Sequence, residues 1–184
     1  AAGRIYRQTG DWPMVCRLLE AELKATTGAK ARFELLLNLA QIQQGRLHDL
    51  AGAARSLQDG LSVRPGELRA LEALASVYGS SDWQQEGGRQ QAAKLYVQIA
   101  QIHRQSKEAD KAVANLAKAL TADANNRDAF RLLEDVYRRT QKYKELESLY
   151  RQRLERAGGA EAIDLQMKRA ALLEEQLGDR PEAI

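Results

Sequence analysis

The sequence has little of what builds β-sheets, disulfide frameworks or metal sites. Its 184 residues include one cysteine, two histidines and three prolines, and aromatic residues make up 5%. A single thiol, Cys16, excludes an intramolecular disulfide and any multi-cysteine metal site, and two histidines exclude a histidine-based zinc site. Alternating runs of Val, Ile and Thr are absent, so strands have little to form from. We therefore expect an all-α protein with no metal and no cofactor.

The chain also lacks a strong net charge and a long apolar run. Its 28 basic and 25 acidic residues give a net charge of +3, a balance that directs it neither to nucleic acid nor to membranes. No stretch approaches the ~18 apolar residues of a membrane span, and the start AAGRIYRQTG has no signal-peptide core. The compartment stays open, with a cytoplasmic location favoured. The missing initiator Met and the end at Ile184, inside an expected helix, indicate part of a longer chain.

A pattern of apolar and small residues recurs after 34 positions without a gap. The first copy consists of Tyr96, Ile99, Ala100, His103, Ala112, Leu116 and Ala119, and the second of Phe130, Leu133, Glu134, Tyr137, Leu146, Tyr150 and Arg153. Within each copy the spacing i, i+3, i+4, i+7 places the residues on one helix face. Each copy therefore predicts two amphipathic helices joined by a short turn, and such hairpins must stack because neither can bury its own face.

The segment between the two copies has the residues of a turn between consecutive helix hairpins, and we call such a segment a seam. Polar turn formers at Asp123 to Asn126 end one helix, and Asn126 or Asp128 is placed to cap the next. An earlier seam lies at Pro65 and Gly66. A longer echo relates YRQTGDW at residues 6–12 to YRRTQKY at residues 137–143, which indicates two related blocks.

These residues resemble the tetratricopeptide repeat family, whose repeat has 34 positions. The resemblance covers residues 93–126 best, with Ala124 where proline is usual, while residues 127–160 are looser, with Glu134 and Arg153 where small residues are expected. The resemblance implies a right-handed superhelical solenoid of stacked antiparallel helix pairs. We predict one array over residues 1–184, comprising a partial hairpin at 1–28, a hairpin at 29–66, an irregular unit at 67–92, repeats at 93–126 and 127–160, and a truncated repeat at 161–184.

The irregular unit departs most from the pattern, because its second helix is short or missing. After a turn at residues 79–83, GSSDW, only Gln84, Gln85 and Glu86 precede Gly87 and Gly88, far fewer than the ~12 of an ordinary helix. Three explanations of the short or missing second helix stay open: a bulged loop, a break in the array, or a deletion between Gly79 and Gly88.

No residue pattern predicts catalysis, so we expect the chain not to be an enzyme. His103 falls at a packing position, and Cys16 lies among apolar residues with no basic group near it in sequence, which indicates a buried, inert thiol. Gly87-Gly88-Arg89 lacks the spacing of a phosphate-binding loop.

The resemblance implies a concave groove lined by the first helix of each hairpin. Carried over position by position, it marks as ligand-groove candidates Lys94, Val97, Gln101, Arg104, Arg131, Asp135 and Arg138. This mostly cationic strip predicts a protein-interaction scaffold that binds a peptide or a partner helix, of acidic character, in the concave groove. Two alternatives stay open. The basic residues between Arg127 and Lys144 suggest an RNA-binding solenoid, and uncapped ends suggest oligomerisation by stacking of the terminal helices.

Overall fold

The computed structural model describes residues 2–177, and these form helices without any strand. The chain divides into two units, residues 1–129 and 130–184. The first unit holds α1 (Ala2–Thr9), α2 (Trp12–Ala25), α3 (Ala29–Gly45), α4 (Leu50–Val63), α5 (Leu68–Gly79), α6 (Gly88–Gln105) and α7 (Ala109–Ala122). Most of α8 (Arg127–Arg139) belongs to the second unit, with α9 (Tyr143–Leu154), α10 (Gly159–Leu172) and a π-helical turn, η1 (Leu173–Leu177). The all-α prediction is confirmed.

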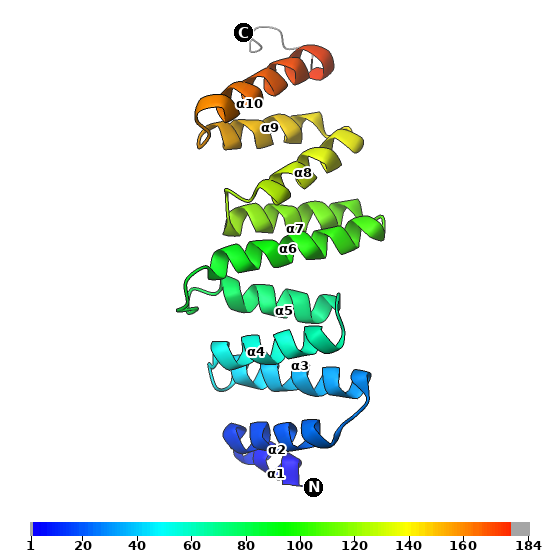
Figure 1. Ribbon diagram of the computed structural model, residues 1–184, viewed down its shortest axis with the longest axis vertical. Helices are drawn as coiled ribbons and strands as arrows, with labels where there is room; N and C mark the ends of the chain where they lie inside the picture. The colour runs from blue at the N-terminus through cyan, green and yellow to red at the C-terminus, as the bar shows by residue number, and fades with distance from the viewer. Residues whose placement is uncertain (1, 178–184) are drawn as a thin grey trace. The chain divides into compact units, whose positions relative to one another are not determined.

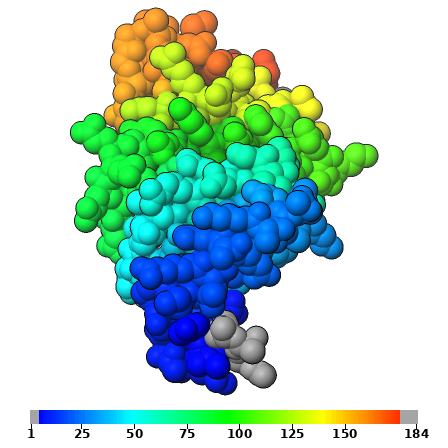
Figure 2. All heavy atoms as spheres, turned by 60° about the horizontal axis from the view of Figure 1, so that its bottom comes forward, coloured from blue at the N-terminus to red at the C-terminus, as the bar shows by residue number. Residues whose placement is uncertain are grey.

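Consecutive helices of the first unit pack side by side, as Figure 1 shows for α3 with α4 and for α6 with α7. One core runs through α3, α4, α5 and α6, and includes Phe33, Leu57, Leu74 and Ala92, all buried. A second cluster joins α2 to α3 around Val15 and Leu39. In Figure 2 the atoms of these early helices, blue to cyan, lie against one another without a break. The helix stacking expected from the repeat pattern is therefore present, while its superhelical hand stays a prediction.

Three hairpin turns share one backbone conformation, which explains the similarity between residues 6–12 and residues 137–143. Gly10, Lys107 and Gln141 each adopt a left-handed conformation, with φ of 75°, 61° and 56°. In each turn the next residue donates its N–H to a carbonyl five residues earlier, at 2.8 to 2.9 Å, as in Asp11 to Tyr6 and Lys142 to Tyr137. This bond satisfies a carbonyl at the end of the preceding helix.

The predicted seam between α7 and α8 is confirmed in detail. Asp123 receives the N–H of Asn125 on its side chain at 3.0 Å, and Asn126 accepts the N–H of Ala129 at 2.9 Å. Asn126 is therefore the residue that caps α8, as expected of Asn126 or Asp128.

The segment expected to be irregular holds a single helix, α5, followed by a loop at residues 80–87. α5 packs on α4 and on α6, so the core continues through this segment. The indole of Trp83 lies over Gly88 and meets Tyr78 edge-on, with ring centroids 4.9 Å apart. α6 consequently begins at Gly88, five residues before the predicted repeat boundary at residue 93. The division into six units otherwise stays a prediction, and residues 178–184 of the last unit lie outside the described part.

Candidate functional site

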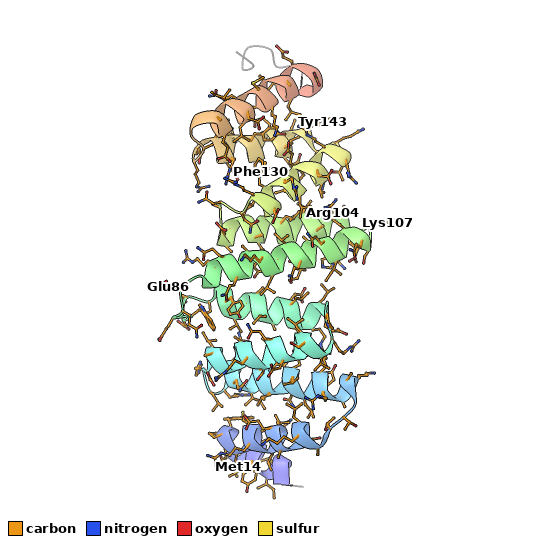
Figure 3. All side chains as sticks on the ribbon, in the orientation of Figure 1. Met14, Glu86, Arg104, Lys107, Phe130 and Tyr143 are labelled. Atoms are coloured by element: carbon orange, nitrogen blue, oxygen red, sulfur yellow. The ribbon has the colours of Figure 1, made fainter. Side chains whose placement is uncertain are left out.

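Helix α6 carries the first group of predicted groove residues, and it contains no acidic residue. Lys94 and Gln101 are exposed and Arg104 is half-buried, so these three side chains reach the surface of the first unit. Figure 3 places Arg104 and Lys107 at the end of α6 that turns into α7, and Glu86 in the loop at its other end. The surface of α6 is therefore polar and carries positive charge without any acidic side chain of its own.

Val97 was predicted to face the groove, and this assignment is wrong. Its side chain is only 7% exposed and belongs to the buried face of α6 with Ala93 and Ala100. Burial is the favourable state for this apolar side chain, since α5 and α7 both pack against α6. The groove candidates on α6 are thus Lys94, Gln101 and Arg104.

Helix α8 carries the second group, and its charges are largely compensated within the second unit. Arg131 and Arg138 are exposed, but Arg138 donates to Glu134 at 3.2 Å and to the Tyr150 hydroxyl at 3.0 Å. Asp135 pairs with Arg139 at 2.8 Å. These pairs reduce the positive charge that the sequence suggested for this helix.

Tyr150 is the residue of this region that sequence reasoning assigned only to packing. Its side chain is fully buried, and its hydroxyl donates to Glu134 at 2.7 Å while accepting from Arg138. Burial, more than the hydrogen bond to Glu134, raises the pKa of Tyr150 to about 12. Glu134 also lies 4.0 Å from Lys168 of α10. The glutamate at a position expected to be small therefore holds α8, α9 and α10 together.

Other ion pairs join the helices of the second unit in the same way. Arg169 of α10 donates to Glu147 of α9 at 2.7 Å, and Arg153 pairs with Glu161 at 2.7 Å. These charges link helices to one another, so their main role is structural.

His103 and Cys16, the two side chains considered as candidates for chemistry, are both buried among residues that pack the fold. His103 is 6% exposed, and its Nδ1 lies 2.6 Å from a Glu108 carboxylate oxygen, which confirms a satisfied structural histidine. Cys16 is buried, and desolvation first, then Glu20 and Asp49, raise the pKa of its thiol.

Residues 2–177 hold no group of three or more His, Cys, Asp or Glu side chains placed to bind a metal ion. Within the same residues, no helix is both long and apolar enough to span a bilayer.

The structure adds four glutamines to the α6 surface that the predicted positions missed. From Gln90 onward, the exposed residues of α6 are Gln90, Gln91, Lys94, Gln98, Gln101 and Gln105. The sequence signal was present in their spacing of three and four residues, which marks one face of a helix. The family pattern marked Lys94, Val97, Gln101 and Arg104 and so passed over these four glutamines.

Comparison with known proteins identifies the repeat. The family model for the tetratricopeptide repeat matches residues 1–31 and 129–162. No curated protein matches the sequence.

Several solved structures of other proteins resemble this chain, each with a TM-score below 0.5. A crystal structure of MamA is 19% identical over 100% of this chain and 88% of its own, with a TM-score of 0.42. A tetratricopeptide repeat protein from Parabacteroides merdae is 19% identical over 99% of this chain and 73% of its own, with a TM-score of 0.45. A thermophilic repeat protein from Thermus thermophilus is 22% identical over 94% and 96%, with a TM-score of 0.37.

Proposed function

The chain contains tetratricopeptide repeats, and from this premise we propose that it is a protein-interaction scaffold that binds a peptide or a partner helix along α6. Proteins built from this repeat typically act as scaffolds and not as catalysts. The proposal accordingly assigns no reaction to the chain.

The observation that carries the proposal is the composition of α6. Its 18 residues include Arg89, Lys94 and Arg104 but no aspartate or glutamate. Lys94 and Gln101 are exposed at two of the positions where the repeat family lines its groove. A helix surface with cations and uncharged amides, and without carboxylates, favours a ligand that supplies carboxylates itself.

Arg131 of α8 supports the same partner chemistry. Its side chain is exposed, as is that of Arg138, which bonds to Glu134 and to Tyr150. We expect an acidic peptide to be preferred over a neutral one.

Selection of peptides from a random library tests the proposal. A phage-displayed dodecapeptide library is panned on the immobilised full chain, and the enriched peptides are measured by fluorescence anisotropy. We expect enrichment of acidic peptides and about tenfold weaker binding to Lys94→Glu, since reversing one interfacial charge costs on the order of 1 to 2 kcal/mol.

Lys30→Glu provides the matched control, because Lys30 is an exposed lysine on α3. It makes the same change in net charge, and binding should be unaffected. Failure to enrich any peptide contradicts the proposal, as does an equal loss of binding in Lys94→Glu and Lys30→Glu.

A further inference from the structure

Helices α1, α2 and α3 and helices α8, α9 and α10 are two related triplets. The family model matches parts of both. Helix α2 begins at Trp12 and α9 at Tyr143, an offset of 131 residues. Helix α3 begins at Ala29 and α10 at Gly159, an offset of 130 residues. These offsets pair each residue of the first triplet with an equivalent residue of the second.

In the first triplet the contact between the second and third helices is apolar. Val15, Cys16 and Leu19 of α2 and Leu39 and Ile42 of α3 form one buried cluster. None of these five side chains is more than 7% exposed, and none carries a charge. Apolar burial of this kind is non-directional, so it stabilises the contact without selecting a particular partner helix.

The second triplet has an ion pair in the equivalent contact. Glu147 of α9 stands where α2 has Cys16, and Arg169 of α10 stands where α3 has Leu39. The Arg169 Nε lies 2.7 Å from the Glu147 Oε1, and the two side chains are only 26% and 15% exposed. Figure 1 shows α9 and α10 side by side around this pair. The equivalents of the other cluster residues are buried, namely Leu146, Tyr150 and Leu172.

This difference makes the two contacts unable to accept each other's helices. If α9 packed on α3, the Glu147 carboxylate would lie against Leu39 inside the apolar cluster. If α2 packed on α10, Arg169 would face Cys16 and lack Glu147. Either arrangement buries a charge without its partner, which is costly. Two apolar contacts would tolerate both arrangements, because the hairpins are alike in shape and pattern.

We propose that the Glu147–Arg169 pair determines which hairpin packs on which helix, so that the hairpin α1–α2 of one chain does not exchange with the hairpin α8–α9 of a second chain. This inference concerns assembly of the array and does not depend on the ligand that the chain binds. An apolar pair of similar volume is often as stabilising as a buried ion pair. Removing the pair should therefore change how chains pack together more than it changes their stability.

The test compares full chains whose two contacts are alike with full chains whose two contacts differ. The natural chain has different contacts. Glu147→Leu, Arg169→Met makes both contacts apolar, and Cys16→Glu, Leu39→Arg gives the ion pair to both. All four substitutions together move the ion pair to the first triplet, so the contacts differ again. Circular dichroism checks that each chain is helical.

Each chain is unfolded in urea, refolded at high concentration and analysed by size-exclusion chromatography with light scattering. Exchange of hairpins between chains gives oligomer that was absent before unfolding. We expect the two chains with alike contacts to form about tenfold more of this new oligomer than the two chains with different contacts. A fully buried pair would give a larger ratio, since Glu147 and Arg169 keep some exposure to solvent.

Equal amounts of new oligomer from all four chains overturn the proposal. So does oligomer that appears with Glu147→Leu, Arg169→Met and persists when the ion pair is moved to the first triplet, because added apolar surface then explains it. If Cys16→Glu, Leu39→Arg prevents folding, the charge-reversed chain Glu147→Arg, Arg169→Glu replaces it. Its contacts still differ, so it should refold like the natural chain, and new oligomer from it contradicts the proposal.

Discussion

Replacing Gly88 with alanine tests the packing of the loop between α5 and α6. A Cβ atom at this position would overlap Cδ1 of Trp83 and lie 2.8 Å from both Trp83 Nε1 and the Tyr78 carbonyl oxygen. The indole can move away, whereas the carbonyl belongs to the backbone near the end of α5, so this second contact is relieved only if the backbone shifts as well. Trp83 has no hydrogen bond to hold it, because its buried indole nitrogen has no partner within residues 2–177.

The expected cost follows from the contacts that moving Trp83 would break. Overpacking of this kind typically costs about 1 to 3 kcal/mol, and loss of the edge-on contact with Tyr78 is worth about 0.5 to 1.5 kcal/mol. The higher helix propensity of alanine offsets about 0.5 to 1 kcal/mol of these two costs. We therefore expect Gly88→Ala to lower the free energy of unfolding by about 2 kcal/mol.

Urea unfolding followed by circular dichroism and by tryptophan fluorescence measures this change. A Trp12→Phe background leaves Trp83 as the only tryptophan, so its fluorescence reports on the loop. Gly45→Ala is the matched control: it ends α3, has nothing within 4 Å of an added Cβ, and should be neutral or slightly stabilising. If Gly88→Ala is as stable as Gly45→Ala, the packing of Trp83 on Gly88 is wrong.

Three further predictions concern single side chains. Tyr150→Phe should cost about 1 to 3 kcal/mol, because it removes a buried hydroxyl that bonds to Glu134 and Arg138. Since the folded pKa of Tyr150 is raised to about 12, its stabilising contribution should be complete below pH 10 and be lost as pH rises through 12, and absorbance at 295 nm should show a late-ionising tyrosine that Tyr150→Phe removes. Cys16 should react with a thiol reagent only when its helix opens, so rapid labelling of the native chain would refute its burial. Asn126→Ala should destabilise α8 by about 1 kcal/mol in a thermal melt, and no change would exclude the cap.

The sequence predicted the features that depend on local spacing. The 34-residue period predicted a short turn between the two helices of each copy, and the structure has these turns at Lys107 and Gln141, 34 residues apart and alike in backbone conformation. The polar seam predicted a cap at Asn126 or Asp128, and the structure has it at Asn126. Turns and caps are determined by a few neighbouring residues, so a single sequence is enough to identify them.

Features that depend on contacts between helices were not predictable in the same way. Val97 occupies a position that the family exposes, yet it is buried here between helices that pack on α6. Glu134 stands where a small residue was expected, because its carboxylate accepts a hydrogen bond from the hydroxyl of Tyr150, 16 residues later. The period shows which face a residue occupies but not which partner it meets across the next helix.

The claim that α6 holds the ligand is tested most directly by nuclear magnetic resonance. A ¹⁵N-labelled chain is titrated with the most strongly enriched peptide, and backbone and glutamine side-chain amide signals are followed. The account predicts that the largest shifts fall in residues 90–105 and include the carboxamides of Gln98 and Gln101. Saturable binding that shifts signals of other helices while those of α6 stay unchanged would contradict it.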